Sequence, residues 1–188
     1  VPWQTCTSIA KNSWGYTENN KFKSAYHVIC DLIDIVSKNG VMLLNVGPKP
    51  DGTITDEETA VLNEIGDWLK TNGEGIYDTV PWKTFGEGKV NTKDGSFKDN
   101  KTKKYTEKDF RFTYKDGAVY VFQMKPTHDG VIRIKNFKKI TQDAIVYSVK
   151  LLGNHSPTII SRTEKYMELK LMEIPQTTLP LCFKIVLE

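Results

Sequence analysis

Cysteine and histidine are scarce in this sequence, and neither is clustered. The chain has 188 residues, of which three are cysteine and three are histidine. Cys6, Cys30 and Cys182 lie too far apart for the spacing of a zinc site or a disulfide framework. We therefore expect buried free thiols, no bound metal and no cofactor. The cysteines give no indication of the cellular compartment.

The sequence also lacks a strong charge of either sign and a long apolar run. A net charge of +3 with 26% charged residues does not predict a nucleic-acid partner. A basic run at residues 98–104 is broken by Asp99 and is typical of a solvated loop. No apolar run is long enough to cross a bilayer and no signal peptide is recognisable, so we expect no membrane partner. The sequence begins at Val1 without a methionine, and we expect the true N-terminus to lie elsewhere.

The first 20 residues combine large amphipathic rings with small turn-forming residues. Trp3, Trp14 and Tyr16 supply the rings, while Pro2 and Gly15 are among the residues that interrupt any sustained periodicity. This composition predicts a loop. We expect it to form one wall of a pocket whose other walls are not in this sequence.

Residues 24–72 predict a helix, a strand and a second helix. Apolar residues between 25 and 36 recur at helical spacing, and Ser-Lys-Asn-Gly at 37–40 is a stop signal. The apolar run at 41–46 predicts a parallel strand covered on both faces, whose ladder partners must come from elsewhere. Thr55 and Glu58 form a capping box in which Glu58 reaches back to the Thr55 amide.

The pattern changes after Trp82. Residues 86–109 are rich in Gly, Lys and Asp and predict a linker or surface excursion. Short alternating segments separated by turn signals then predict an antiparallel β-sandwich of about seven or eight strands, beginning with a hairpin. The expected strands are residues 110–114, 118–124, 131–135, 144–152, 158–160, 167–171 and 181–187. We thus expect three parts: an α/β part at 1–85, a linker at 86–109 and an all-β domain at 110–188.

A series of motifs, in order, resembles the α-L-fucosidases of glycoside hydrolase family twenty-nine. The motifs are Trp-Gln-Thr-Cys at 3–6, Ser-Trp-Gly-Tyr at 13–16, Val-Ser-Lys-Asn-Gly at 36–40, Leu-Leu-Asn-Val-Gly-Pro at 43–48, Asp-Gly-Thr-Ile at 51–54, Gly-Asp-Trp-Leu at 66–69 and Asn-Gly-Glu-Gly-Ile-Tyr at 72–77. The resemblance is dense through residue 82. It implies the last segment of a TIM-like (β/α) barrel followed by a β-sandwich. Barrel active sites lie at the C-terminal ends of the strands, which here means residues 45–48, with the opening loop over the same end.

The resemblance also implies the reaction, the hydrolysis of terminal α-L-fucose with retention of configuration. Retention requires a nucleophile and an acid/base, two carboxyl groups about 5–5.5 Å apart. In the family, the nucleophilic Asp and the sugar-binding histidines belong to earlier barrel strands. We therefore expect no catalytic residue in this chain, which alone should be inactive. Its expected partners are a fucosylated carbohydrate and the preceding part of the same protein.

Three residues of the opening stretch are the expected substrate-binding residues. By the resemblance, Trp14 contacts the fucose methyl group, although a tryptophan buried as packing between loop and barrel is the alternative. The Tyr16 hydroxyl either supports the pocket or caps the fold. Gln4 stands where the family usually has Glu, and an amide keeps the hydrogen-bonding shape but cannot exchange a proton near neutral pH. We expect Gln4 to be a supporting group rather than the mark of an impaired or altered enzyme.

The remaining acidic residues are expected to be structural. Glu58 and its neighbours on the second helix read as cap or surface residues, and Glu74 is a weaker candidate for a supporting role at the barrel rim. Asp31 and Asp34 should be solvated or paired with lysine. A different function also fits the sequence: a non-catalytic β-sandwich that binds carbohydrate or protein and carries a barrel remnant. An upstream strand ending in Trp-x-Asp, together with a paired His-His, would favour the enzyme.

Overall fold

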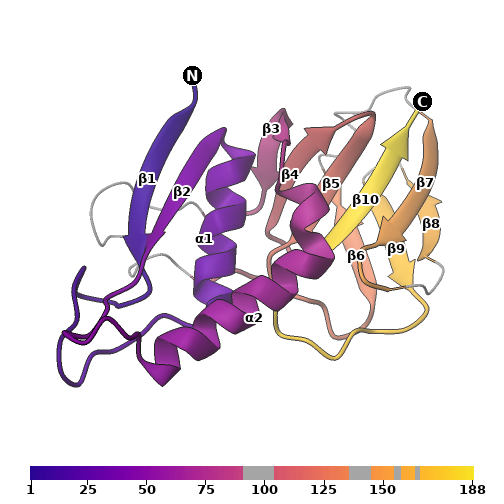
Figure 1. Cartoon of the computed structure of the whole chain (residues 1–188). Helices are drawn as coiled ribbons and strands as arrows, with labels where there is room; N and C mark the ends of the chain where they lie inside the picture. The colour runs from indigo at the N-terminus through magenta and orange to yellow at the C-terminus, as the bar shows by residue number, and fades with distance from the viewer. Residues whose placement is uncertain (91–103, 136–144, 155–157, 164–165) are drawn as a thin grey trace.

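The structure is a computed structural model that describes residues 1–90, 104–135, 145–154, 158–163 and 166–188 (Figure 1). Most of the predicted linker, the basic run except Lys104, and the first residue of the strand predicted at 144–152 lie outside these ranges.

Two parallel strands form the first sheet. β1 (Trp3–Ser8) pairs with β2 (Gly40–Asn45), with Trp3 opposite Gly40 and Ser8 opposite Asn45. The prediction of a loop through the first 20 residues is therefore wrong for β1. The parallel direction of β2 is as predicted, but β1 is a ladder partner within this chain, so the expectation that its partners come from elsewhere is wrong. Val41 and Leu43 are more than half exposed, so the described chain does not itself cover β2 on both faces.

Two helices accompany this sheet, as predicted. α1 (Ala25–Ser37) begins at Ser24, whose hydroxyl accepts a hydrogen bond from the His27 amide at 3.3 Å. α2 (Asp56–Asn72) begins at Thr55, whose hydroxyl accepts from the Glu58 amide at 3.2 Å, and it continues into the short 3-10 helix η1 (Gly73–Gly75). These side chains satisfy backbone donors that a helix start leaves unpaired.

The rest of the described chain forms two antiparallel sheets. Their strands are β3 (Val80–Glu87), β4 (Phe110–Lys115), β5 (Ala118–Gln123), β6 (Val131–Ile134), β7 (Val146–Leu151), β8 (Thr158–Arg162), β9 (Met167–Leu171) and β10 (Leu181–Leu187). The larger sheet has the order β3-β4-β5-β10-β7 and the smaller one β6-β9-β8. The predicted hairpin is confirmed: β4 and β5 are joined at Asp116 and Gly117, both with positive φ, as tight hairpin turns require.

The predicted boundary at residue 85 falls inside β3. Val80 pairs with Tyr114, and Glu87 pairs with Phe110, so β3 is the edge strand of the five-stranded sheet. That sheet therefore begins before the predicted linker.

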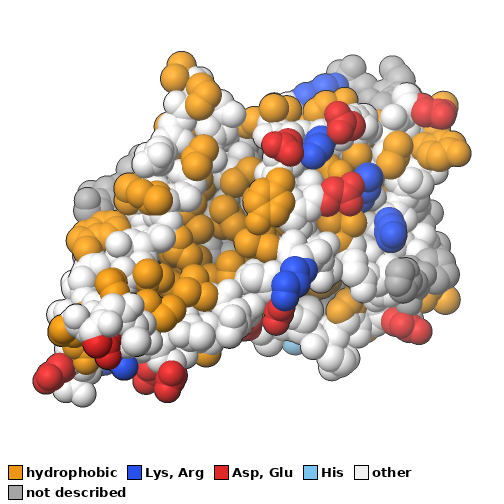
Figure 2. Space-filling model, in the orientation of Figure 1, with side chains coloured by type: hydrophobic (Ala, Val, Ile, Leu, Met, Phe, Trp, Pro, Cys, Tyr) orange, Lys and Arg blue, Asp and Glu red, His pale blue; other side chains and the backbone are white. Residues whose placement is uncertain are grey.

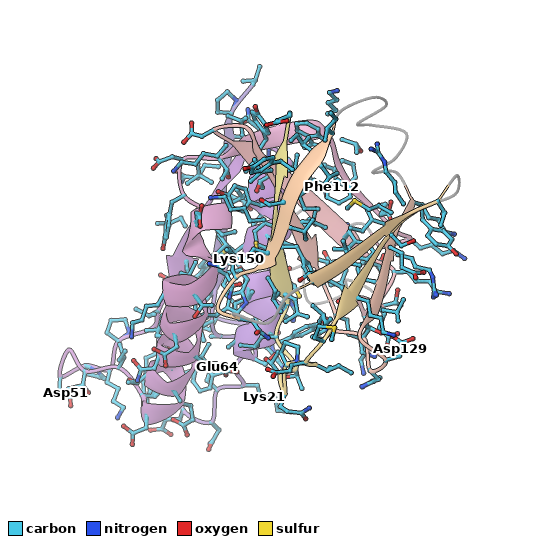
Figure 3. All side chains as sticks on the ribbon, turned by 90° about the vertical axis from the view of Figure 1, so that its right-hand side faces the viewer. Lys21, Asp51, Glu64, Phe112, Asp129 and Lys150 are labelled. Carbon is cyan, nitrogen blue, oxygen red and sulfur yellow. The ribbon has the colours of Figure 1, made fainter. Side chains whose placement is uncertain are left out.

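The five-stranded sheet lies between two hydrophobic cores. Val119 and Val121 of β5 face the core shared with the smaller sheet, whereas Tyr120 and Phe122 face the core shared with α1 and α2. This alternation follows the two-residue period of a strand. Trp68 of α2 closes the helical side by donating to the Pro180 carbonyl at 2.9 Å. Figure 1 shows α2 crossing in front of this sheet and α1 between β2 and β3, and the side view in Figure 3 shows helices on one side and strands on the other.

A buried ion pair links α1 to β4. Asp34 contacts the Arg111 guanidinium, and both side chains are at most 3% exposed. Arg111 also donates to the carbonyls of Phe110 (2.8 Å) and Val90 (2.7 Å), and Lys38 contacts Asp34 at 2.8 Å. Of the two predicted alternatives for Asp34, pairing with lysine is confirmed, and β4 covers the side chain instead of leaving it solvated.

Asp31 and two of the three cysteines are buried. Asp31 is buried with its carboxylate 3.3 Å from the His27 imidazole, so the expectation that it is solvated is wrong. Cys30 and Cys182 are buried free thiols as predicted, but Cys6 is exposed because it lies on the open β1–β2 sheet.

Candidate functional site

The opening loop is held at the C-terminal end of the parallel sheet. Ser8 and Asn45 are the last paired residues of β1 and β2, so both strands end at the same edge. From there the Asn45 side-chain amide donates to the Trp14 carbonyl at 2.6 Å and to the Ser8 hydroxyl at 3.4 Å. The loop at residues 13–16, called the aromatic loop below, therefore lies against residues 45–48.

Gly47 allows the aromatic loop to approach this closely. A Cβ at residue 47 would lie 2.9 Å from both the Gly15 carbonyl carbon and the Tyr16 nitrogen, which is closer than real Cβ contacts. Within the loop, the Ser13 hydroxyl donates to the Gly15 carbonyl at 2.8 Å. The loop backbone and the Gly47 backbone are thus in direct contact.

The two rings of the aromatic loop are accessible. Trp14 is 42% exposed and Tyr16 is 38% exposed. The described chain leaves both rings partly uncovered. Two exposed aromatic side chains at the end of parallel strands offer an apolar wall to a ligand.

Gln4 lies away from these rings. It is opposite Val41 near the start of β1, and its amide nitrogen is 4.0 Å from the Cys6 sulfur. Four residues of extended strand separate it from Ser8, a distance of about 13 Å. The structure therefore places Trp14 and Tyr16 in one loop beyond the end of β1, and Gln4 near the start of that strand.

Glu58 belongs to this region, which sequence reasoning did not predict. Its carboxylate accepts from the Gly47 amide at 3.0 Å and from the Thr55 hydroxyl at 3.2 Å. These contacts replace the predicted bond from Glu58 to the Thr55 amide, so that half of the capping box is wrong. Capping patterns concern the helix alone, and no periodic signal indicates a contact with the loop before it.

Glu74 faces the β-sheet rather than a barrel rim, so its predicted position is wrong. The Tyr120 hydroxyl donates to its carboxylate at 2.7 Å, and Lys184 pairs with the same oxygen. The hydrogen bonds from Lys184 and Tyr120 hold the pKa of Glu74 below its usual range. Glu74 is therefore a carboxylate that bridges η1 to the β5–β10 pair.

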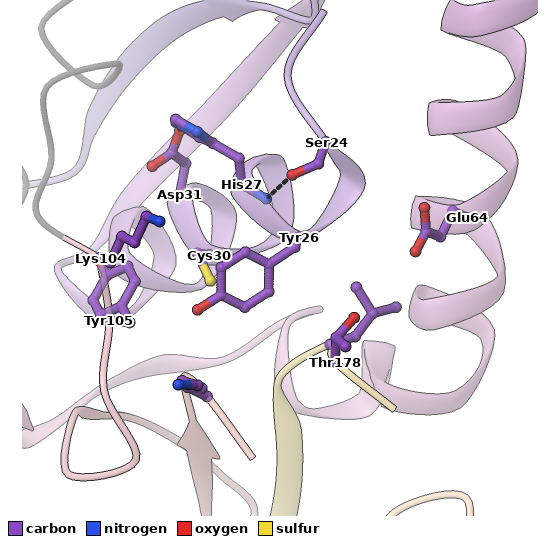
Figure 4. Close-up of a pocket in the computed structure, with 11 residues that line it drawn as sticks. Ser24, Tyr26, His27, Cys30, Asp31, Glu64, Lys104, Tyr105 and Thr178 are labelled. Carbon is purple, nitrogen blue, oxygen red and sulfur yellow. Dashed lines mark hydrogen bonds and ion pairs between the residues drawn. The ribbon is translucent and has the colours of Figure 1, made fainter. Parts of the chain in front are cut away.

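A concave region lies between the two helices and the segments flanking the five-stranded sheet (Figure 4). This cavity of about 630 Å³ is lined by residues that include Tyr26, Cys30, Asp31, Glu64 and Tyr105, and by none of Gln4, Trp14 or Tyr16. Burial raises the pKa of both the Tyr26 phenol and the Cys30 thiol. Both groups stay protonated at neutral pH, and Cys30 therefore lacks the thiolate form of a nucleophile.

The described residues offer neither a metal site nor a membrane-spanning helix. No group of three or more His, Cys, Asp or Glu side chains in the described ranges could hold a metal ion. Within the same ranges, no helix has the length and apolar character needed to cross a membrane.

Comparison with known proteins gives one family. Residues 1–74 match the family model described as alpha-L-fucosidase. The chain is 33% identical over 139 residues to rat (Rattus norvegicus) tissue alpha-L-fucosidase, covering 72% of this chain and 26% of the relative. It is 29% identical over 187 residues to the mouse (Mus musculus) tissue enzyme, covering 96% and 36%.

Solved structures give the same result. The fold resembles that of the Thermotoga maritima alpha-fucosidase with a TM-score of 0.75 and 26% identity, covering 98% of this chain and 39% of that chain. Another structure of that enzyme, with a TM-score of 0.73, 26% identity and coverage of 98% and 39%, is a complex with fucose. The chain thus spans only about a quarter to two fifths of the length of these relatives.

Proposed function

The chain belongs to the α-L-fucosidase family, and we propose that it is the C-terminal part of a retaining exo-α-L-fucosidase. Its substrate would be terminal α-L-fucose on glycoconjugates or oligosaccharides. The observation that carries this proposal is the docking of the aromatic loop at the C-terminal ends of two parallel strands. That end of the strands is where barrel enzymes bind their substrates.

In this proposal, β1 and β2 are the last two strands of a TIM-like barrel, and α1 and α2 are its outer helices. The barrel part predicted at 1–85 then ends before β3, because β3 pairs with β4 in the five-stranded sheet. Most of 86–109 would be a connecting segment, and β3 together with 110–188 would form the β-sandwich domain. The exposed Val41 and Leu43 support the barrel assignment, because they lie on the same face of β2 and an apolar strand face needs cover. The cover would be the preceding part of the same protein, which would also supply the nucleophile and the acid/base.

The aromatic loop would bind the apolar side of the sugar. Fucose has a methyl group where related hexoses have a hydroxymethyl group, and Trp14 offers an accessible ring against it. A preference for one such group contributes about 1–3 kcal/mol. Tyr16 would support the same wall. Gln4, located near the start of β1, would act on the strand rather than on the sugar.

The test is hydrolysis of an aryl α-L-fucoside by the complete protein and by residues 1–188 alone. We expect turnover only from the complete protein, with loss on boiling, inhibition by a fucose-like iminosugar, and release of fucose with retained anomeric configuration by NMR. An aryl β-galactoside is the control substrate. Inactivity of the complete protein towards every fucoside, or full turnover by residues 1–188 alone, would contradict the proposal.

A further inference from the structure

We propose that Glu58 is a positioning residue that holds the aromatic loop in place through Gly47. What the loop binds rests on the proposed function above, whereas the positioning itself rests only on contacts within this chain. Glu58 lies in the first turn of α2. It belongs neither to the aromatic loop nor to β1 or β2.

The first step is the burial of the Glu58 carboxylate. Glu58 is 1% exposed, and glutamate is almost never this buried unless its oxygens have partners. One oxygen accepts from the Gly47 amide at 3.0 Å and the other from the Thr55 hydroxyl at 3.2 Å. Its location at a helix N-terminus further favours negative charge.

Helix capping does not explain this arrangement. The Thr55 hydroxyl already accepts from the Glu58 amide at 3.2 Å, so the start of α2 has its cap without the Glu58 carboxylate. The carboxylate instead reaches Gly47, which is 11 residues earlier in the chain. Its role therefore concerns the end of β2 as well as the helix.

The second step is the contact from Gly47 to the loop. The Gly47 backbone lies so close to Gly15 and Tyr16 that a Cβ would meet their backbone atoms at 2.9 Å. A shift of Gly47 must therefore shift these two residues, because packed backbones cannot interpenetrate. Asn45 holds the loop at a second point through the Trp14 carbonyl at 2.6 Å. Glu58 fixes the first of these two points.

The experiment compares Glu58→Ala and Glu58→Gln in the complete protein. Glutamine keeps both contacts, since its carbonyl oxygen can accept from Gly47 and its amide can donate to Thr55. Amide hydrogen exchange of a peptide spanning residues 13–16 should be about tenfold faster in Glu58→Ala and close to wild type in Glu58→Gln. For an aryl α-L-fucoside, KM should rise about tenfold in Glu58→Ala with kcat changed less than about threefold.

The matched control is Asn72→Ala at the other end of α2. Asn72 is also buried and donates to the Trp68 carbonyl at 3.0 Å. It is the last residue of α2, whereas the contact with Gly47 is made from the first turn. We expect this variant to lose global stability while loop exchange and KM remain at wild-type values. Unchanged loop exchange in Glu58→Ala, an equal defect in Glu58→Gln, or the same loop defect in Asn72→Ala would overturn the proposal.

The Gly47→Ala variant and the wild-type protein provide two further controls. If Glu58→Ala does not fold, Gly47→Ala displaces the loop from the other side and should give the same faster loop exchange; normal exchange there would overturn the proposal. If the wild-type complete protein hydrolyses no fucoside, the proposed function fails, while the exchange measurement still decides the role of Glu58.

Discussion

Gln4 lies near the start of β1, whereas the aromatic loop is held beyond the end of that strand. Proton transfer to a sugar bound at the loop would need a group within hydrogen-bonding reach, about 2.6–3.2 Å or one water further. We therefore propose that residue 4 supports the strand, which glutamine can do with its amide.

The Gln4→Glu variant of the complete protein tests this interpretation. We expect kcat/KM to change by less than about tenfold. A general acid/base contributes roughly a hundredfold or more to the rate, and a residue that transfers no proton lacks this contribution. The measurement is hydrolysis of an aryl α-L-fucoside across the pH range. A hundredfold gain, with a new ionisation in the pH profile, would assign proton transfer to this position.

Asp109, which directly precedes β4, has a carboxylate that accepts four hydrogen bonds. It is 1% exposed and accepts from the amides of Lys89 (2.8 Å), Val90 (3.1 Å) and Thr106 (2.7 Å), and from the Thr106 hydroxyl (2.6 Å). Burial alone would raise the pKa of Asp109, but these hydrogen bonds outweigh it, and its pKa lies below the usual value.

A lowered pKa gives Asp109 a defined effect on acid stability. The stabilisation is fully present above the unfolded pKa of about 3.9 and is lost as the pH falls towards the folded pKa. Asp109→Asn should lower the free energy of unfolding at pH 7 by about 1–3 kcal/mol and flatten its decline below pH 4. Urea denaturation at several pH values measures both effects. Asp67→Asn, which removes an exposed ion pair with Lys70, is the control and should leave both unchanged.

At the scale of secondary-structure elements, the Asp34–Arg111 pair joins α1 to β4. Both partners are buried, and Arg111 also serves two backbone carbonyls. The attraction in such a site offsets a large desolvation cost, so the loss of one partner is more harmful than the replacement of both.

Single and double variants separate these effects. Asp34→Leu and Arg111→Met should each destabilise the protein by about 3–5 kcal/mol, because each removes a close partner of a buried charge. The double variant Asp34→Leu/Arg111→Met should be more stable than the sum of the single effects indicates. Lys38→Met, at the partly exposed end of the cluster, should cost about 0–1 kcal/mol. If the change in unfolding free energy of the double variant, measured by urea denaturation, equals the sum of the two single changes, the pair is not coupled.

Sequence patterns predicted the elements whose signals are local. α1 and α2 follow from apolar stripes with Ser24 and Thr55 caps, and the β4–β5 hairpin follows from its Asp-Gly turn. β1 was missed because residues 3–8 have no apolar run and take their strand form from pairing with a segment 37 residues later. The same holds for the site: the motif at 13–16 identified the loop, but its contacts with Gly47 and Glu58 are tertiary.

At the scale of the whole molecule, the β1–β2 sheet has an apolar surface that the described chain does not cover. Val41 is 59% exposed and Leu43 is 56% exposed, and hydrophobic side chains gather over the β1–β2 half and the neighbouring helices (Figure 2). Open strand edges next to such a surface favour aggregation.

Charged substitutions on this surface should act in opposite directions on the two forms of the protein. Val41→Lys/Leu43→Lys should increase the soluble fraction of residues 1–188 alone, measured by centrifugation, because it breaks the apolar surface. In the complete protein the same change should abolish fucoside hydrolysis, since the lysines would be buried. Ile145→Lys, at a position that is 62% exposed beside the β7 edge strand, is the control and should leave hydrolysis unchanged. An active Val41→Lys/Leu43→Lys enzyme would contradict the proposed barrel.

The two-faced five-stranded sheet has a consequence for inheritance. β5 and β10 bury Tyr120, Phe122 and Cys182 against α1 and α2, and β3 starts before the sequence turns to its all-β pattern. A gene rearrangement that moved only the all-β segment into another protein would strip this surface and remove an edge strand. The two antiparallel sheets are therefore not expected to fold as an independent domain without α1 and α2. Their helix-facing residues are expected to evolve jointly with those of the two helices.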